Sequence, residues 1–332
     1  MDVRRHLERL PDDVVPQIEE IRLRLGRPLA VVLATGQAFV APGGRLGAES
    51  AAGYMVTAED IRRTLETVSQ SSWYALAEQL RGGFITVPGG HRLGLAGEAV
   101  LDGKEVRSLK HIASINVRVA KEIPGCAAAI LPYLWEHETG LPHHTLIISP
   151  PRAGKTTILR DVVRCLGGGA PHLRLPPLSV GLVDERWEIA ACFQGVAQND
   201  VGPCTDVLAG WPKAEGMLVL LRSMSPKVIA TDEMGGANDL EALQEVLHAG
   251  VRVVTTVHAA SLEELARRPG WQPLLAAHAF ARYVVLSGRW GPGTVEAVLD
   301  ATGARALFKG PWRGPGSCAG SPCTAATGGR GA

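Results

Sequence analysis

The chain has 332 residues, of which 46% are hydrophobic and 20% are charged, and its formal net charge is +1. This length suits about two domains of roughly 100–200 residues each, with enough apolar material for a buried core. A charge so close to zero argues against a general electrostatic attraction to nucleic acid or to membranes.

Six scattered cysteines form no C-x-x-C pair, which argues against both a disulfide framework and a zinc site. We therefore expect reduced and mostly buried thiols. No apolar run reaches the roughly 18 residues of a membrane-spanning helix, and the N-terminus lacks the apolar stretch of a signal peptide. These features predict a cytoplasmic protein, and docking on a membrane complex remains compatible with them.

The first 140 residues have the patterns of a small α+β domain. Residues 21–25 alternate between apolar and arginine side chains, which predicts a half-exposed strand, and residues 29–33 predict a second strand after Arg27-Pro28. Thr57 and Asp60 resemble a capping box, which predicts a helix from there to about residue 70. Residues 83–100 predict two strands around a turn at 88–90.

From residue 141 to about residue 305, short apolar strands alternate with helices. Strands are predicted at 145–149, 180–185, 227–233 and 251–258, and helices at 156–166 and 239–250, the second of them closed by Gly250. This alternation predicts an α/β domain with a mostly parallel sheet and helices on both faces. Ligands of such sheets bind beyond the carboxyl ends of the strands, where this chain places its polar residues.

The last part of the chain, residues 306–332, is rich in Gly, Ala, Ser and Pro. This composition predicts a disordered tail.

A glycine–lysine–threonine motif follows the strand at 145–149 and opens a helix. In this context the backbone N–H groups of a loop and of a helix N-terminus can hold phosphates, Lys155 can contact them, and Thr156 can bind Mg²⁺. The usual phosphate-loop pattern begins with glycine, whereas this chain has Ser149. Serine costs little there if the backbone φ is negative, and about 1–2 kcal/mol if φ is positive.

Three further strand ends carry polar side chains that suit phosphate chemistry. Asp232 can hold Mg²⁺ and Glu233 can polarise a water molecule. Asp184, Glu185, Arg186 and Glu188 follow the strand at 180–185. His258 ends the strand at 251–258 and can sense a γ-phosphate or orient a water molecule.

Each motif alone has a simpler interpretation: a chance sequence at a helix start, ordinary strand-end acids, surface charge, or a structural histidine. Their occurrence at four strand ends of one domain favours a site for a nucleoside triphosphate with Mg²⁺. The expected cofactors are ATP and Mg²⁺.

Six stretches of the chain, at 89–100, 114–127, 149–161, 183–192, 206–236 and 247–265, together resemble the stage III sporulation protein AA family. The resemblance runs from about residue 18 to about residue 300. That family is similar in turn to the type II/IV secretion ATPases. The resemblance implies a P-loop fold of the RecA or secretion-ATPase type, with a smaller α+β domain before it.

The resemblance also implies roles for individual residues. It assigns Asp232 to the metal, together with Thr156, and it assigns catalytic roles to Lys155, Glu185, Arg222, Glu233 and His258. The phosphate loop it implies comprises Ser149, Pro150, Pro151, Arg152, Ala153, Gly154, Lys155, Thr156 and Thr157. Family members usually begin this loop Gly-Pro-Pro, so Ser149 departs from the pattern.

The implied function is that of a cytoplasmic Mg²⁺-dependent ATPase, a hexameric ring that drives a membrane channel complex between mother cell and forespore. The protein would be peripheral at the mother-cell face of the forespore membrane. An arginine from a neighbouring subunit would complete the site, with Arg22, Arg24, Arg92 and Arg118 as candidates, although each also suits a solvated strand face. Two alternatives are a nucleic-acid-directed P-loop ATPase, which charge and the few aromatic residues disfavour, and a non-catalytic nucleotide-gated assembly protein.

Overall fold

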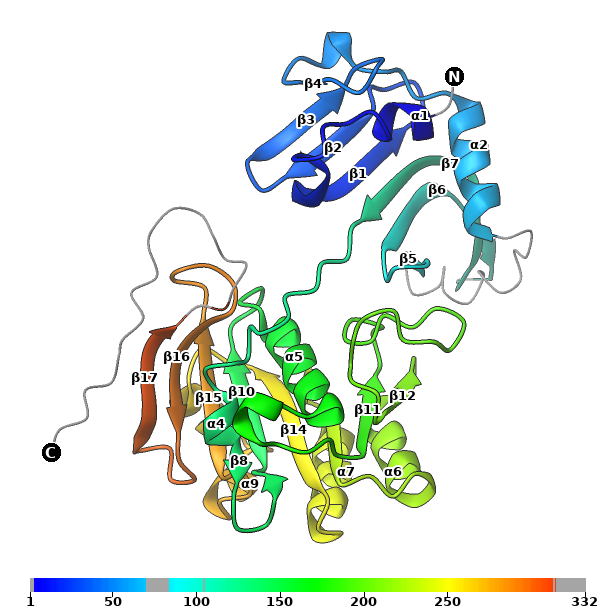
Figure 1. Ribbon diagram of the computed structural model, residues 1–332. Coiled ribbons are helices and arrows are strands. Elements are labelled where there is room, and N and C mark those ends of the chain that lie inside the picture. The colour runs from blue at the N-terminus through cyan, green and yellow to red at the C-terminus, as the bar shows by residue number, and fades with distance from the viewer. Residues whose placement is uncertain (1–2, 70–83, 104, 313, 315–332) are drawn as a thin grey trace, which may run out of the picture. The chain divides into compact units, whose positions relative to one another are not determined.

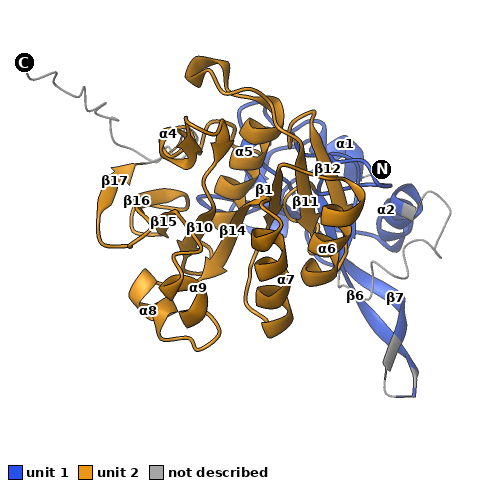
Figure 2. Cartoon of the chain, turned by 90° about the horizontal axis from the view of Figure 1, so that it is seen from below, with its two compact units in different colours: residues 1–121, 191–199 blue, residues 122–190, 200–332 orange. Residues whose placement is uncertain are grey.

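The computed structural model describes residues 3–69, 84–103, 105–312 and 314. The chain forms two compact units, one of residues 1–121 and 191–199 and the other of residues 122–190 and 200–332 (Figure 2). Within the described residues, none of the helices has the length and apolar character that crossing a membrane requires.

The first unit is built on a seven-stranded antiparallel sheet of order β4-β3-β2-β1-β7-β6-β5. Its strands are β1 (Ile18–Arg24), β2 (Ala30–Leu33), β3 (Gly36–Val40), β4 (Leu46–Gly47), β5 (Phe84–Thr86), β6 (Arg92–Asp102) and β7 (Glu105–Arg118). Its described helices are α1 (Val3–Leu7) and α2 (Ala58–Ser69). The strands predicted at 21–25, 29–33 and 83–100 therefore form, and residue 83 itself lies outside the described part.

Helix α2 begins with the predicted capping box. The Asp60 backbone N–H donates to Thr57 Oγ1 at 3.2 Å, and the Thr57 N–H donates to Asp60 Oδ2 at 2.9 Å. The Asp60 carboxylate also accepts from the Tyr54 hydroxyl and from the Val3 backbone N–H, so it joins α1 and the segment before α2 to the start of α2. Because alternate strand residues face opposite sides, Leu23 and Ile115 lie in the core with Ile61 of α2, while Arg22 and Arg24 face away from it.

The second unit contains an eight-stranded sheet of order β12-β11-β13-β14-β10-β15-β16-β17 (Figure 1). The six strands from β12 to β15 are parallel, and the last two pairings are antiparallel. The strands are β10 (Thr145–Ser149), β11 (Val180–Asp184), β12 (Thr205–Ala209), β13 (Val228–Thr231), β14 (Arg252–His258), β15 (Arg282–Ser287), β16 (Thr294–Leu299) and β17 (Ala306–Trp312). This arrangement confirms the predicted α/β fold with a mostly parallel sheet.

Helices cover both faces of this sheet. The connection from β10 to β11 runs one way across the sheet, and those from β12 to β13 and from β13 to β14 run the other way, so right-handed crossovers place their helices on opposite faces. Helix α5 (Lys155–Gly168) lies on one face, and α6 (Lys213–Ser223) and α7 (Ala237–His248) lie on the other. The unit also contains three short helices, α4 (Leu131–Leu134), α8 (Leu262–Ala266) and α9 (Gln272–Ala276). A small hairpin is formed by β8 (Trp135–Glu136) and β9 (Leu141–Pro142). Gly250 has the left-handed conformation, φ 77°, that ends α7 as predicted.

Three segments are grouped differently from the sequence pattern. Residues 122–140 belong to the second unit, although the sequence suggests a division near residue 140. Residues 191–199 leave the second unit and pack in the first, where the Gln198 side-chain oxygen accepts the Gly89 N–H at 2.9 Å. Ala306–Trp312, which composition assigns to the tail, forms β17 by pairing with β16. Residues 315–332 lie outside the described part.

Asp161 fastens the segment at 122–130 to helix α5. Its buried carboxylate accepts the backbone N–H groups of Gly125 at 3.0 Å and Ala127 at 2.7 Å. Arg164, one turn further along α5, lies 2.6 Å from the same carboxylate. These bonds satisfy backbone donors that would otherwise be buried without partners.

We expect Asp161→Ala to lower the free energy of unfolding by about 2–4 kcal/mol, because it leaves two backbone N–H groups without an acceptor. Asp161→Asn, which keeps one oxygen acceptor, should cost less. Chemical denaturation of both variants measures the difference. Asp206→Ala, on the exposed side of β12, is the control, and equal losses in all three variants would contradict this role.

Candidate functional site

The loop at 149–157, hereafter the GKT loop, connects the buried strand β10 to α5. Gly154, which precedes the helix, has φ 87°, a conformation that L-residues with side chains rarely adopt. A Cβ atom added there would lie 2.5 Å from the Gly293 backbone nitrogen. Gly293 in turn donates its N–H to the Ala153 carbonyl at 2.8 Å, so the turn between β15 and β16 packs directly against the loop. Glycine is therefore required at 154.

Ser149 is the last residue of β10 and pairs in register with His258 of β14. It has extended strand geometry, and its hydroxyl donates to the Pro150 carbonyl at 2.8 Å. The left-handed positions of the loop are instead Arg152, with φ 61°, and Gly154. The sequence left open whether the backbone φ at position 149 is negative or positive. The structure has the extended backbone of a strand there, in which a serine side chain causes no strain.

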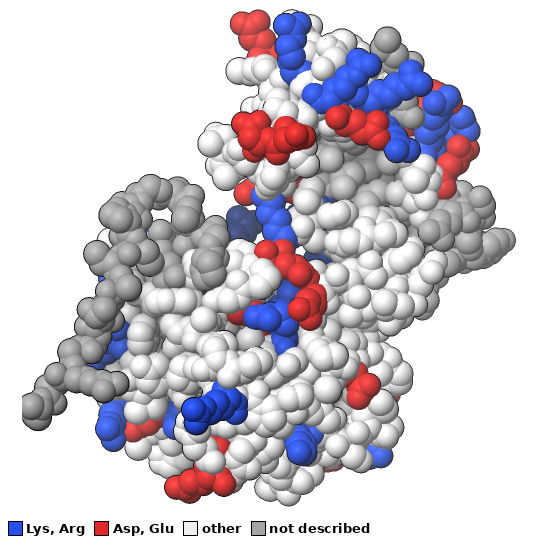
Figure 3. Space-filling view, in the orientation of Figure 1, with Lys and Arg blue, Asp and Glu red and all other residues white. Residues whose placement is uncertain are grey.

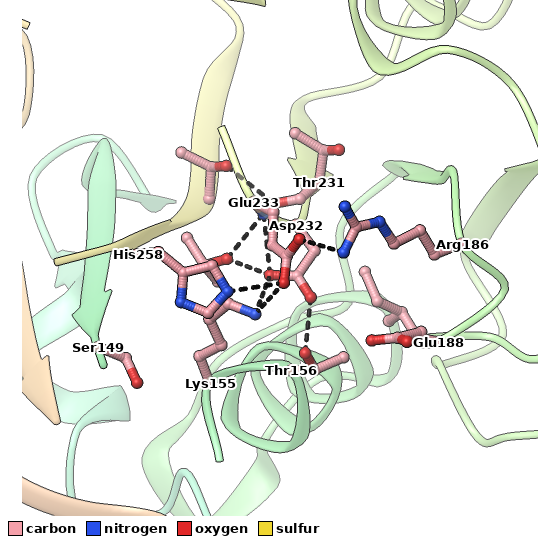
Figure 4. A network of polar contacts seen from close by, with 12 residues as sticks. Ser149, Lys155, Thr156, Arg186, Glu188, Thr231, Asp232, Glu233 and His258 are labelled. Carbon is pink, nitrogen blue, oxygen red and sulfur yellow. Dashed lines mark hydrogen bonds and ion pairs between the residues drawn. The ribbon is translucent and has the colours of Figure 1, made fainter. Parts of the chain in front are cut away.

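Glu233 lies at the centre of a cluster of charges at the ends of the parallel strands (Figure 4). Its Oε1 lies 2.6 Å from Lys155 Nζ and 2.9 Å from His258 Nε2. Its Oε2 lies 2.5 Å from an Arg186 guanidinium nitrogen. Three cationic or protonatable groups, from the segments after β10 and β11 and from the end of β14, thus meet on one carboxylate.

Asp232 and Thr156 bring two hard oxygen ligands together. Thr156 Oγ1 donates to Asp232 Oδ2 at 2.6 Å, and the other Asp232 oxygen accepts from the Thr256 hydroxyl and lies 3.8 Å from Lys155 Nζ. A hydroxyl and a carboxylate are the ligand types that Mg²⁺ prefers. Within the described ranges no group of three or more His, Cys, Asp or Glu side chains could hold a metal. A cation here would take its remaining ligands from phosphates and water.

Electrostatics keep Glu233 ionised. Burial raises the pKa of its carboxyl, but the hydrogen bond and charge of Lys155, the charge of Arg186 and the hydrogen bond from His258 outweigh it, so the pKa lies below the ordinary value of 4.5. Its backbone is held in the left-handed region, φ 54°, where its N–H donates to Thr256 Oγ1 at 2.9 Å. Non-glycine residues in that region are uncommon and frequently occur at functional sites.

Asp184, at the end of β11, shapes the loop that carries Arg186. Its buried carboxylate accepts the N–H groups of Glu188, Ile189 and Ala190 at distances of 2.8 to 3.2 Å. Arg160 of α5 donates to the carbonyls of Glu188 and Ile189 from the other side. Asp184 therefore holds the loop in place.

Glu185 forms an ion pair with Lys213, the first residue of α6. Both line a small pocket with Asp184, Arg186, Glu188, Asp232 and Glu233. The structure thus brings Glu185 to the same pocket as Asp232 and Glu233, where it is paired with the first residue of α6.

Arg222 is not brought to this cluster. It is exposed in the last turn of α6, whose first residue, Lys213, is the one at the pocket. Eleven residues of helix span about 16 Å, so Arg222 lies toward the opposite edge of the sheet. Its predicted catalytic role remains a prediction without support from contacts within the chain.

Three residues of the site received no role of their own from the sequence. Arg186 is adjacent to Glu185 in a charged segment, and its contact with Glu233 depends on how Asp184 folds the loop. Lys213 follows a Trp-Pro pair and opens α6, which is not among the helices predicted from the sequence pattern. Thr256, inside an apolar strand, was also overlooked, and its polar side chain in an otherwise apolar run was the available signal.

Comparisons with known proteins show the family of the chain and its fold. The family model described as "Sporulation stage III, protein AA" matches residues 1–306. The stage III sporulation protein AA of Bacillus subtilis (strain 168) is 41% identical over 297 residues, which cover 90% of this chain and 91% of that protein. An uncharacterized protein ycf45 of Porphyra purpurea is 24% identical over 200 residues, covering 59% of this chain and 33% of that protein.

Two solved structures share the fold. The Legionella pneumophila ATPase DotB superposes with a TM-score of 0.50 at 16% identity, covering 81% of this chain and 72% of that one. The pilus retraction motor PilT, solved with bound ADP, gives a TM-score of 0.50 at 15% identity and covers 82% and 75%. The predicted family resemblance and the predicted secretion-ATPase-like fold are both confirmed.

We expect Glu233→Gln to destabilise the protein at neutral pH, because three positively charged or protonatable groups lose their common carboxylate. Since the folded-state pKa of Glu233 is depressed, its stabilisation is present above pH 4.5 and is lost as the pH falls through the folded-state pKa. Urea unfolding at pH 7 should show a loss of roughly 1–3 kcal/mol. The gap to wild type should close as the pH is lowered below 4.5.

Glu241→Gln, on the exposed side of α7, is the matched control and should show no such pH dependence. A difference between Glu233→Gln and wild type that stays constant from neutral to acid pH would contradict the expectation.

Proposed function

We propose that this chain, which belongs to the Sporulation stage III, protein AA family, is a Mg²⁺-dependent ATPase that works as the motor of a sporulation-associated channel. The observation that carries the proposal is the convergence of Lys155, Thr156, Asp232, Glu233 and His258 beyond the carboxyl ends of three parallel strands. Such strand ends are where α/β sheets bind ligands.

Each of these side chains has a specific task in ATP hydrolysis. Lys155 would exchange the Glu233 carboxylate for the β- and γ-phosphates, and Thr156 and Asp232 would hold Mg²⁺, which would neutralise phosphate charge. Glu233, released from Lys155, would orient the attacking water molecule, and its low pKa keeps it ready to accept a hydrogen bond. His258, bonded to Glu233 Oε1, would hold that carboxylate in position.

The N-terminal unit would supply an arginine to the nucleotide of a neighbouring subunit in a ring, for which we propose six copies. One face of its sheet has Arg22 beside Asn116 and Arg24 beside Ser114, across a hollow floored by Gly94. Arg92 and Arg118 form the next row with Glu20, which lies 2.6 Å from Arg22. Acidic and basic side chains lie intermixed on the visible side of this unit (Figure 3), so the unit as a whole is not a basic surface.

The family relationship suggests where the motor works. We propose a cytoplasmic protein that is peripheral to the membrane at the mother-cell side of the forespore, where membrane proteins of the channel complex would be its partners. Support comes from the name of the 41% identical relative and from the absence of a spanning helix among the described residues.

A nucleotide-gated assembly protein remains the second candidate. The charge cluster of Glu233 favours it in one respect, because the same contacts would hold the strand ends together without nucleotide and change when a phosphate binds. It differs from a motor in having no turnover that depends on Glu233. We expect no stimulation by DNA or RNA in either case.

We expect Lys155→Ala to lose both nucleotide binding and hydrolysis, and Glu233→Gln to keep binding but lose at least about a hundredfold in turnover, since the water molecule is no longer oriented. Phosphate release, measured together with oligomeric state by light scattering, tests both. Lys227→Ala, exposed before β13, is the control. Wild type without Lys155-dependent hydrolysis would overturn the motor proposal, and binding without Glu233-dependent turnover would favour the gated protein.

Mixed rings test the arginine in trans. We expect Arg24→Ala or Arg22→Ala to lower kcat by at least about tenfold, because arginines that neutralise transition-state charge have large effects. Mixing such a variant with Lys155→Ala should restore part of the activity, since one subunit then offers an intact site and the other an intact arginine. Full activity of the Arg22, Arg24, Arg92 and Arg118 variants, each tested singly, would exclude all four.

A further inference from the structure

The sheet topology sets the direction in which a nucleotide extends from the GKT loop. Strand β13, which carries Asp232 and Glu233, lies two positions from β10 on one side, and β15 is the neighbour of β10 on the other. The reacting γ-phosphate belongs beside these acids, and the loop holds the other phosphates. The nucleoside end must therefore leave the loop on the side of β15.

An apolar hollow lies against the GKT loop on that side. Its walls come from three places: the start of α5, the turn between β15 and β16, and the segment that Asp161 fastens to α5. The lining residues are Ile123, Cys126, Gly154, Thr157, Ile158, Pro292, Gly293 and Gly314. The turn is bonded to the loop through Gly293 and Ala153, so the hollow and the loop share a wall.

Hydrogen bonds join the wall around Cys126 to α5. The Cys126 thiol donates to the Thr157 carbonyl at 3.4 Å, and Asp161 accepts the N–H groups on both sides of Cys126. Burial raises the pKa of the Cys126 thiol to about 12, so it stays neutral and contributes apolar surface. A preformed apolar hollow of this kind suits the flat faces of a nucleobase.

A second hollow also borders Thr157 but has a different lining. It contains Glu122, Arg160, Asp161, Arg164 and Asp200. Asp161 and Arg164 are paired with each other, and Glu122 accepts the Asp200 N–H at 2.7 Å. Charged groups that are already engaged offer little to the face of a base.

We infer that the apolar hollow binds the nucleoside end of the nucleotide, with the base against Ile123 and Pro292 and the sugar near Thr157. This inference rests on the proposed function, because it assumes that phosphates bind at Lys155. It assigns Ile123 and Pro292, neither of which any motif singles out, to nucleotide affinity without a part in the chemistry.

The test compares ADP with inorganic pyrophosphate, which has the same two phosphates and no nucleoside. Isothermal titration calorimetry with Mg²⁺ should show wild type binding ADP more tightly. Ile123→Ala should weaken ADP binding roughly tenfold by removing buried apolar contact, and leave pyrophosphate binding within about twofold. Pro292→Ala, at an exposed turn position, should act in the same direction.

Leu247→Ala is the matched control, because Leu247 is a partly buried apolar residue near the end of α7, away from the loop. It should change neither affinity. Equal effects of Ile123→Ala on both ligands, or no effect on ADP from either hollow variant, would overturn the assignment. Wild type that binds pyrophosphate as tightly as ADP would overturn it while the phosphate site stands, whereas wild type that binds neither would overturn the proposed function as well.

Discussion

The ion pair between Lys155 and Glu233 is the interaction on which the geometry of the strand ends depends. Both side chains are largely buried, and either charge left alone in such a place is costly. The pair joins the loop after β10 to the residues after β13, across the intervening strand β14. Arg186 and His258 contact the same carboxylate, so one acidic group holds four segments of the second unit together.

This pairing has a consequence for ligand binding. A phosphate that approaches Lys155 competes with Glu233 for the ammonium group, and the carboxylate then remains bonded to His258 and Arg186. The competition links occupancy of the loop to the freedom of the carboxylate. A group that supplies negative charge to Lys155 can therefore release Glu233 without leaving a buried cation unpaired.

Parallel register explains why these residues meet. Thr231 pairs with Thr255, so the residues that follow, Asp232 and Thr256, are neighbours at the edge of the sheet, and Ser149 lies beside His258 in the same way. The Thr256 hydroxyl then donates to Asp232 and accepts the Glu233 N–H. A one-residue slip of β14 would move this hydroxyl to the other face of the sheet.

The sequence was sufficient for the α/β fold, for the strands that end on Asp232 and His258, and for the capping box at Thr57, because these depend on local patterns. It was insufficient where a role depends on partners distant in the chain. The sequence groups Asp184 with other charges, yet its carboxylate accepts the backbone N–H groups of Glu188, Ile189 and Ala190 and so shapes the loop. Ala306–Trp312 has the composition of a tail, and pairing with β16 makes it a strand.

The glycines of the phosphate-loop pattern are not equivalent, and this chain separates their roles. Position 149 belongs to a buried strand, where a side chain is not strained and its hydroxyl finds a carbonyl acceptor. Position 154 combines a left-handed backbone, which disfavours a Cβ atom, with the close approach of Gly293, which leaves no room for one. The usual sequence pattern requires glycine at both positions, whereas the backbone of this chain requires it only at position 154. The departure at Ser149 therefore leaves intact the part of the loop that opens helix α5.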